Sequence, residues 1–338
     1  MPPVYVVILA HGGQVWLERF LPSVLHTNYP NFTIWLLDNA SQPSLVEWSQ
    51  LNFPTLRVIR YEKNEGYAGA YQRFFSAHGK EVPYIALLNS DIEVTPSWLQ
   101  PLIDQMERIP RLAAIQPKIL SWKDRAAFEY AGAAGGFLDS WGYPICRGRG
   151  EKDKGQYDKA SRIFWVSGAA CVIRTAAIWE TQGGLLFKPY YFMHMEEIDL
   201  CWRLQRAGYW IGYEPNSVVY HVGGASLASH NPQKVYFNFR NSLYLLWENL
   251  SGWEKKSFLL RRLLLDAPAA IYLLFKGGFP HFWAVIKAHR DFFRRIIRGT
   301  REASLLPSLP STPYKSLEGV AKGSYYIGTV EYPWLPLS

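Results

Sequence analysis

The N-terminal stretch Val4-Tyr5-Val6-Val7-Ile8-Leu9-Ala10-His11-Gly12-Gly13 sets the pattern from which the fold can be predicted. Its nearly continuous apolar run is typical of a strand that is buried on both faces of a parallel sheet. The polar residues after it mark a turn at the carboxyl end of that strand. Similar runs follow at 33–37, 56–60, 84–88 and 113–117, and helix-like stretches separate them at 15–25, 67–78 and 96–108. This alternation predicts an α/β fold with a mostly parallel central sheet flanked by helices.

The rest of the chain is predicted to become helical after an irregular region. Residues 121–160 are rich in glycine and charge and are expected to form a long mobile excursion. The pattern then predicts strands over 164–173 and 212–220, and helices from Thr175, over 196–206 and over 231–250. A helical pair, interrupted at Gly277-Gly278-Phe279-Pro280, is expected over 253–299. We therefore expect a body over 1–250, a basic helical extension over 251–302 and an irregular, proline-containing tail over 303–338.

Composition and charge exclude several classes of protein. With 49% hydrophobic and 19% charged residues, the chain is globular. Most of its net charge of +8 lies in 251–302, where eleven basic side chains face four acidic ones. These charges lie among leucines and phenylalanines and not on an aromatic platform, so nucleic-acid binding is not expected. No apolar run reaches the roughly 18 residues of a membrane span. Three cysteines without a CxxC pair, and the lack of a secretory signal, predict a cytoplasmic protein.

Acidic residues follow two of the predicted strands. Asp38 ends Leu36-Leu37-Asp38, where its carboxylate could accept a hydrogen bond from the imide N–H of uracil or thymine; an Asx turn that closes the strand is the alternative. Asp91 ends Leu88-Asn89-Ser90-Asp91, where one carboxylate suffices for a divalent cation that also binds substrate phosphates. His221 follows the predicted strand over 212–220. For Asp91 and His221, a purely structural role is the alternative.

The stretch Phe192-Met193-His194-Met195-Glu196-Glu197-Ile198-Asp199-Leu200-Cys201-Trp202-Arg203 places three acids within four positions. Acids are favoured in a first helical turn, and Asp199 and Arg203 have the spacing of an ion pair. This does not explain why aromatic and methionine residues precede two adjacent glutamates. A carboxylate beside apolar side chains has a raised pKa and can act as a general base.

Together these motifs resemble those of the family 2 glycosyltransferases, and in particular the rhamnosyltransferase-like branch. The resemblance covers about residues 4–250 and rests on the number, order and spacing of the motifs. Further motifs that carry it are Leu37-Asp38-Asn39-Ala40-Ser41, Asn64-Glu65-Gly66-Tyr67-Ala68-Gly69-Ala70, Ser167-Gly168-Ala169-Ala170 and Arg240-Asn241. It implies a GT-A fold in which residues 1–120 bind a nucleotide sugar and residues 121–250 bind the acceptor. Gln-x-x-Arg-Trp, typical of processive synthases, is missing from the sequence, so transfer of single sugars is expected.

The resemblance also implies roles for individual residues. Glu197 stands in the place of the catalytic base, beside Glu196; the family usually has Glu-Asp here, so the carboxylate is kept and lengthened by one methylene. Asp91 would bind a divalent cation, Mg²⁺ or Mn²⁺, with His221 close to the metal and the diphosphate. His11 stands where the family more often has Asn. The residues expected around the donor are Ala10, His11, Asp38, Asn64, Gly66, Gly69, Asn89 and Ser90.

We therefore expect an inverting, metal-dependent enzyme that moves one sugar from a UDP- or dTDP-linked donor to a hydroxyl of a surface-glycan or lipid-linked acceptor. A non-catalytic scaffold that binds nucleotide sugars is the alternative. Two interpretations of residues 253–299 stay open. Arg290, Arg294, Arg295 and Arg298 share a helix with Phe282, Trp283, Ile286, Phe293 and Ile297, which suits peripheral contact with the inner face of the plasma membrane. A helical pair packed on the body, with a solvated basic side, is the other.

Overall fold

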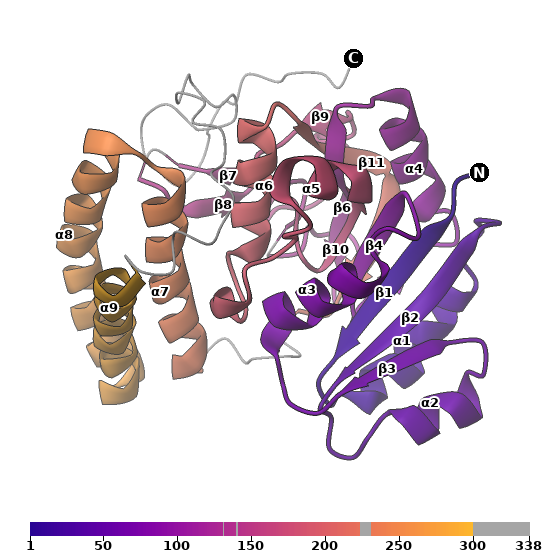
Figure 1. The fold of residues 1–338 in the computed structure, drawn as a ribbon, viewed down its shortest axis with the longest axis horizontal. Coiled ribbons are helices and arrows are strands. Elements are labelled where there is room, and N and C mark those ends of the chain that lie inside the picture. Colours follow the sequence, from indigo (N-terminus) through magenta and orange to yellow (C-terminus); the bar gives the residue numbers. More distant parts are fainter. Residues whose placement is uncertain (131, 140, 224–230, 300–338) are drawn as a thin grey trace.

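A mixed β-sheet forms the centre of the molecule (Figure 1). The computed structural model describes residues 1–130, 132–139, 141–223 and 231–299. The strands of the sheet are β1 (Val4–Ala10), β2 (Phe32–Asn39), β3 (Arg57–Tyr61), β4 (Tyr84–Asn89), β5 (Ile92–Val94), β6 (Leu112–Ser121), β9 (Ser161–Arg162), β10 (Ala170–Arg174) and β11 (Trp210–His221). Their order is β3-β2-β1-β4-β10-β6-β11-β5, and β9 pairs with β11.

The sequence predicted a mostly parallel sheet, but only half of the pairings between its described strands are parallel. β1 pairs in parallel with β2 and β4, β2 with β3, and β6 with β11. β10 is antiparallel to its neighbours β4 and β6, and β5 is antiparallel to β11. The carboxyl ends of β1, β2, β3 and β4 therefore meet at one edge of the sheet, which is where ligands bind in open α/β sheets.

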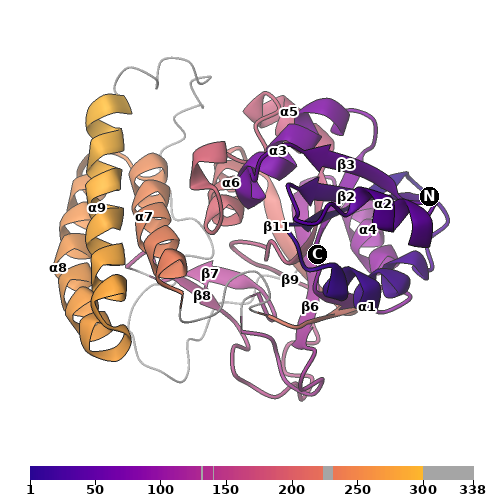
Figure 2. The same ribbon diagram turned by 90° about the horizontal axis from the view of Figure 1, so that it is seen from below.

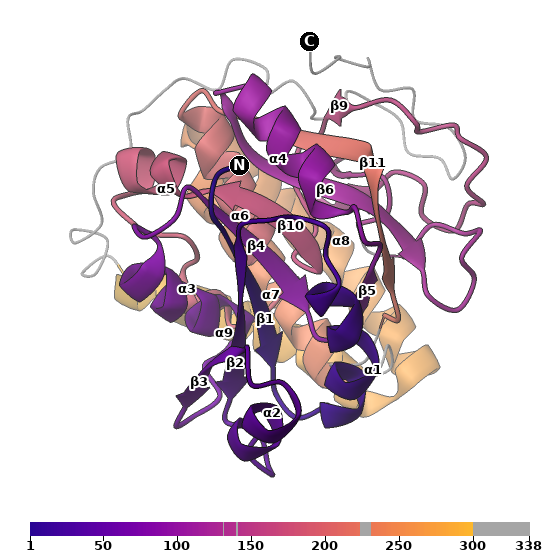
Figure 3. The same ribbon diagram turned by 90° about the vertical axis from the view of Figure 1, so that its right-hand side faces the viewer.

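Helices cover both faces of this sheet (Figure 3). One core lies under α1 (Gln14–Leu25) and α4 (Leu99–Arg108), and the other under α3 (Gly66–His78), α5 (Thr175–Gln182) and α6 (Glu196–Arg206). The side chains of β1 alternate between them, since Val6 and Ile8 belong to the first core and Val7 to the second. The short helix α2 (Val46–Asn52), which the sequence did not predict, follows turn-forming residues and contacts β3.

The described part of 121–160 is packed, so the predicted mobile excursion was wrong. It contains the hairpin of β7 (Gly136–Leu138) and β8 (Pro144–Cys146), and it buries Phe128 and Phe137 in the core. Its glycines allow close contact instead of motion. A Cβ atom on Gly136 would lie 2.1 Å from the indole ring of Trp165, a distance that no side chain tolerates.

The strand predicted over 164–173 was wrong in its first half, because β10 begins only at Ala170. Side chains bind the backbone just before it. The Ser167 N–H donates to Gln116 Oε1 at 2.8 Å, and the Tyr67 hydroxyl donates to the Gly168 carbonyl at 2.6 Å. With these polar partners, residues 167 and 168 need no neighbouring strand.

Three helices form a layer beside α6, at the end of the molecule opposite β3 and α2 (Figure 2). They are α7 (Pro232–Asn249), α8 (Gly252–Gly277) and α9 (Phe279–Gly299), and the break between the last two falls where the sequence predicted it. α9 buries Val285, Ala288 and Phe292, and Phe293 contacts the core instead of lying free on an exposed apolar face. No helix in the described ranges is long and apolar enough to cross a membrane. The predicted tail over 303–338 lies outside these ranges.

Candidate active site

A cavity of about 1060 Å³ lies at the carboxyl edge of the sheet, beside the starts of α6 and α7. Five of the predicted site residues line it, namely Asn89, Asp91, Glu196, Glu197 and His221. They come from the ends of β4 and β11 and from the first turn of α6, so the fold joins segments that are more than 100 positions apart. Ala10, His11, Asp38, Asn64, Gly66, Gly69 and Ser90 do not line this cavity.

Glu196 is buried and Glu197 is half-buried, and neither carboxylate has all its hydrogen bonds. The Oε2 atom of each is inaccessible and has no hydrogen-bond partner within the described residues. Burial raises the pKa of Glu197 to about 7. Burial, together with the charge of Glu197, raises the pKa of Glu196 well above its ordinary value. A carboxyl group with a pKa near neutrality is suited to accept a proton from a hydroxyl nucleophile.

Asp199, on the same helix, is buried with partners. It accepts hydrogen bonds from Lys188 at 2.9 Å, Arg203 at 2.8 Å and Asn249 at 2.9 Å, so the predicted ion pair with Arg203 is confirmed. Burial alone would raise the pKa of Asp199, but the two cations outweigh it and lower the pKa to about 2. This aspartate is therefore charged and structural.

The loop before the two glutamates is held in a strained conformation. Phe192, His194 and Met195 have φ angles of 65°, 70° and 74°, which non-glycine residues rarely adopt and which cluster at functional sites. Asn241 holds this loop, because its side-chain amide donates to the carbonyls of Tyr191, Met193 and His194 at 2.7–2.9 Å. Its neighbour Arg240 donates to the carbonyls of Tyr190 and Tyr191 at 3.0 and 2.8 Å. The Arg240-Asn241 motif thus fixes the position of the acids.

Gly66 and Gly69 support the same loop from the start of α3. The Ala68 N–H donates to the Phe192 carbonyl at 3.0 Å. Gly66 has a φ of 70°, and a Cβ atom there would lie 2.3 Å from the same carbonyl oxygen. A Cβ atom on Gly69 would reach Pro189, in the short 3₁₀ helix η1 (Pro189–Tyr191). A direct contact between these glycines and a donor stays a prediction.

Hydrogen bonds tie the loops after β1, β2 and β3 together. Asn39, which the sequence analysis did not select, donates to Asn64 Oδ1 at 2.9 Å and accepts from the Glu65 N–H at 2.9 Å. His11 Nδ1 lies 2.7 Å from the Asn39 carbonyl oxygen, and the Gly12 N–H donates to the Ser41 hydroxyl. Asn64 therefore positions this loop, while Ala10 is buried in the sheet and Ser90 lies in the turn between β4 and β5.

Asp38 is fully buried, and its contacts are those of the turn that the sequence left as the alternative. Its Oδ2 atom accepts hydrogen bonds from Arg60 at 2.5 Å and from the Leu45 N–H at 3.1 Å, and its Oδ1 atom accepts from the Ser41 N–H at 2.9 Å. Burial raises the pKa of Asp38, but these donors outweigh it and leave the pKa below its ordinary value. Oδ1 can accept one more hydrogen bond, so recognition of a pyrimidine imide stays a prediction.

Asp91 and His221 are buried side by side, and a third acid joins them. His221 Nε2 lies 3.3 Å from Asp91 Oδ1, and His221 Nδ1 lies 3.5 Å from Oε1 of Glu129. Burial alone would lower the pKa of His221, but the two carboxylates raise it to about 10. Sequence reasoning missed Glu129, because it lies in the glycine-rich region and follows no predicted strand. The cavity wall also includes His194 and Lys234, which were not predicted either.

The donor set of Asp91 and His221 fits a divalent cation that shares its coordination with substrate. In the described part of the chain, no three His, Cys, Asp or Glu side chains form a metal cluster. Asp91 and Glu129 approach opposite nitrogens of the imidazole and so do not converge on one point. One carboxylate and one imidazole leave most coordination positions to phosphate oxygens and water, as is common for Mg²⁺ at phosphate sites.

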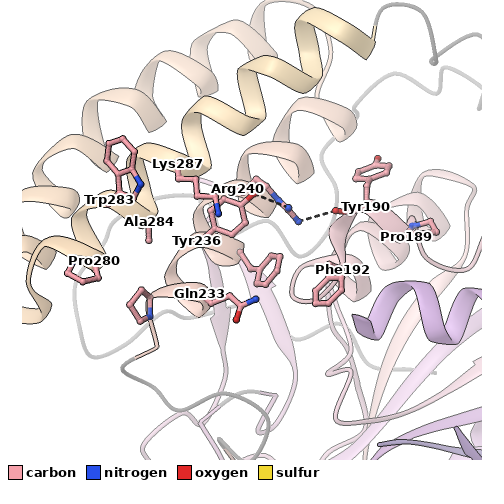
Figure 4. Close-up of a pocket in the computed structure, with 12 residues that line it drawn as sticks. Pro189, Tyr190, Phe192, Gln233, Tyr236, Arg240, Pro280, Trp283, Ala284 and Lys287 are labelled. Atoms are coloured by element: carbon pink, nitrogen blue, oxygen red, sulfur yellow. Dashed lines mark hydrogen bonds between the residues drawn. The ribbon is translucent and has the colours of Figure 1, made fainter. Parts of the chain in front are cut away.

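A second cavity, of about 700 Å³, lies between η1, α7 and α9. Its walls are largely aromatic, with Tyr190, Phe192, Tyr236, Phe237 and Trp283, and the cation Lys287 lies among them (Figure 4). Arg240 takes part in hydrogen bonds to the Tyr190 carbonyl and the Tyr236 hydroxyl. Phe192 lines this cavity while Met193 lines the larger one, so the strained loop separates the two.

Two glycosyltransferases of known sequence are similar to this chain over most of its length. The chain is 25% identical over 270 residues to an N-acetylglucosaminyl-diphospho-decaprenol L-rhamnosyltransferase of Mycobacterium tuberculosis, which covers 74% of this chain and 85% of the relative. It is 24% identical over 245 residues to the rhamnosyltransferase WbbL of Escherichia coli, which covers 70% and 87%.

Solved structures share the fold at low sequence identity. GalNAc-T7 with UDP, GalNAc and Mn²⁺ has a TM-score of 0.58 at 18% identity, and the match covers 92% of this chain but only 59% of that one. Residues 1–349 of Staphylococcus aureus TarS, in complex with UDP-GlcNAc, have a TM-score of 0.56 at 12% identity, covering 86% and 80%. The family model "Glycosyl transferase family 2" matches residues 5–179, which is more than half of the chain. With its GT-A fold, this chain belongs to glycosyl transferase family 2.

Proposed function

We propose that the protein is an inverting, metal-dependent glycosyltransferase that transfers one sugar at a time. The observation that carries this proposal is the pair of incompletely bonded glutamates in the same cavity as Asp91 and His221. Two unpaired carboxyls are costly to bury, so they are expected where their basicity is used. Family membership supports action on a sugar donor.

In this proposal, Glu197 removes the proton from the acceptor hydroxyl while that oxygen attacks the anomeric carbon. Burial keeps the Glu197 pKa near neutrality, where the carboxylate is both available and basic. A divalent cation held by Asp91 and His221 would supply positive charge beside the departing diphosphate. Lys234 lines the same cavity and adds a second positive charge there. Asn241 fixes the loop that aims Glu197, so it acts as a positioning residue.

The donor we propose is UDP- or dTDP-linked, with the Asp38 loop at its pyrimidine. The acceptor we propose is a glycan hydroxyl, carried by a lipid as the names of the rhamnosyltransferase relatives suggest. The aromatic cavity beside the strained loop suits such an acceptor, since aromatic faces stack on apolar faces of ligands. A lipid-linked acceptor would place the enzyme at the inner face of the plasma membrane, with residues 253–299 in contact with it.

Release of nucleoside diphosphate from a panel of nucleotide sugars, with and without Mn²⁺ and acceptor, tests the proposal. We expect turnover with UDP- or dTDP-sugars in the presence of metal, and loss of turnover in chelator. Glu47→Gln, on the exposed side of α2, is the matched control for Glu197→Gln. Donor binding without turnover under all conditions would favour the scaffold alternative. Full activity in chelator would remove the metal role of Asp91.

A further inference from the structure

Helix α8 buries two charged residues and exposes a series of large apolar ones. Its inner face buries the ion pair of Arg262 and Asp266, which lie 3.2 Å apart. His289 of α9 lies 3.0 Å from Asp266, and Arg262 donates to the Ser242 hydroxyl of α7 at 2.9 Å. A surface helix usually turns its polar residues to water and its apolar residues to the core. These contacts to α7 and α9 hold the Arg262 and Asp266 side of α8 against the protein, although Nη1 of Arg262 has no hydrogen-bond partner among the described residues.

The outer face of α8 is an apolar stripe. Trp253, Leu260, Leu264, Ile271 and Phe275 are all exposed, with Trp253 at 79% and Phe275 at 84%. They recur at intervals of seven and four residues, which places them on one side of the helix over a length of about 33 Å. α9, which packs beside α8, adds exposed Phe279, Trp283 and Ile286, whose intervals of four and three residues place them on one side of that helix. Monomeric soluble proteins rarely expose a continuous apolar surface of this extent.

Positive charge surrounds this apolar stripe. The helices α8 and α9 carry ten basic and three acidic side chains. Of the acids, Asp266 is buried and Asp291 pairs with Arg290, whereas Lys256, Arg261, Lys276, Lys287, Arg294 and Arg298 are exposed. An apolar stripe bordered by lysine and arginine, with aromatic residues along it, is the pattern of a helix lying in the headgroup region of an anionic bilayer.

Charge also favours an anionic membrane on this surface over a second copy of the chain or residues 300–338. A second copy of the chain would bring one excess of positive charge against another, which opposes association. Residues 300–338 contain three basic and three acidic side chains, so that segment offers no countercharge. An anionic lipid surface supplies both the apolar volume and the negative charge.

We infer that the outer faces of α8 and α9 form a docking surface for an anionic membrane. The surface goes beyond the α9 face that the sequence suggested, because the structure adds α8 and turns part of α9 inward. Trp283 and Lys287 also line the aromatic cavity, so a docked membrane would lie at its rim. Membrane docking deepens the proposed function by naming where a lipid-linked acceptor is met, but it does not depend on sugar transfer.

Sedimentation of the full chain with vesicles tests this surface. We expect binding to phosphatidylcholine mixed with phosphatidylglycerol, weak binding to phosphatidylcholine alone, and loss of binding in high salt. The triple variant Leu264→Ser, Ile271→Ser and Phe275→Ser should bind the anionic vesicles at least about tenfold more weakly. Arg294→Gln with Arg298→Gln should weaken binding roughly tenfold at low salt.

The matched control is Leu51→Ser, because Leu51 is also 84% exposed but lies on α2, at the opposite end of the molecule. The control should bind vesicles like the parent. All variants should unfold at the same temperature as the parent. With a soluble acceptor, they should also release nucleoside diphosphate from the donor at the same rate as the parent. Vesicle binding is read without any donor sugar, so a failure of the proposed reaction would leave this assay intact. Equal vesicle binding by the parent and the triple variant would overturn the inference. The inference would also be overturned if the parent forms a dimer without lipid that the triple substitution abolishes. It would be overturned as well if vesicle binding appears only after residues 300–338 are removed.

Discussion

Two sets of buried carboxylates lie within one turn of α6 and have opposite properties. Asp199 is surrounded by Lys188, Arg203 and Asn249, and its pKa is lowered to about 2. Glu196 and Glu197, three and two positions earlier, each have an oxygen without a hydrogen-bond partner, and their pKa values are raised. Burial is common to both sets, so the partners decide the outcome. Burial with cations holds Asp199 charged, and burial without them raises the pKa of the two glutamates, one of which is the base in our proposal.

The strongest test of this comparison is to neutralise Glu197, which has no cation as a partner. Glu197→Gln keeps the shape of the side chain but removes its basicity, so we expect sugar transfer to fall by about 10²–10⁴-fold. Donor affinity, measured by calorimetry, should be unchanged. Glu196→Gln should have a milder effect. If Glu196→Gln is inactive while Glu197→Gln has normal turnover, the base is Glu196 and not Glu197.

The converse test removes Asp199, the carboxylate that is paired with cations. Asp199→Ala leaves Arg203 buried without its counter-charge and Lys188 with Glu248 alone, so we expect a loss of about 3–5 kcal/mol in the free energy of unfolding. Denaturation in urea, followed by circular dichroism, measures this. Glu248→Ala, which removes the more exposed partner of Lys188, should cost less. Wild-type stability of Asp199→Ala would show that the ion pairs are not what holds α6.

The pH dependence of stability should have opposite signs for the two sets. The raised pKa of Glu197 means that the folded state holds its proton more tightly than the unfolded state, so stability should fall as the pH rises from about 4.5 through about 7. Glu197→Gln should reduce this fall, gaining about 1–3 kcal/mol over wild type at pH 8 but not at pH 4.5, while Glu196, whose pKa is also raised, keeps part of it. Asp199 stabilises the fold above its ordinary pKa, and that contribution should be lost as the pH falls toward 2. Thermal unfolding measured across this pH range reports the contributions of both Glu197 and Asp199. The same dependence of stability on pH in wild type and Glu197→Gln would contradict the raised pKa of Glu197.

The smallest expected effect concerns Glu129, a carboxylate that lies beside a histidine instead of a lysine or an arginine. Since Glu129 holds the far nitrogen of His221, Glu129→Gln should weaken Mn²⁺ binding about 10–100-fold without abolishing it. Titration calorimetry with UDP present measures the affinity. Glu93→Gln, a nearby acid that pairs with Arg125, is the control. Unchanged metal affinity would mean that Glu129 only fills the core.

The sequence predicted those parts of the site that follow from strand ends. Asp91 and His221 meet because β4 and β11 end at the same edge, and the glutamates meet them because α6 begins there. It could not predict roles that depend on tertiary contact. Asn39 and Glu129 act through residues far away in the chain, and the glycines of 121–160 look mobile until Trp165 is seen against Gly136.

Helix α8 shows a second limit of the sequence. Its periodic pattern contains both an apolar stripe and a spaced Arg262–Asp266 pair, and periodicity alone does not say which of the two faces inward. The assignment required His289 and Ser242, which come from other helices. The predicted helix was therefore right, and the side that it presents to the surroundings could not be predicted.

The hydrogen bond between Ala68 and Phe192, with no room for a side chain at Gly66, also bears on how such enzymes could be recombined. A hybrid that took residues 1–120 from one parent and 121–250 from another would join a foreign α3 to this loop. Any parent with a larger residue in the place of Gly66 would displace Phe192, and with it the carboxyl group of Glu197. If residues 1–120 bind the donor, as we propose, such a parent can lend its donor specificity only when its own segment in the place of Pro189 to Glu197 is transplanted as well.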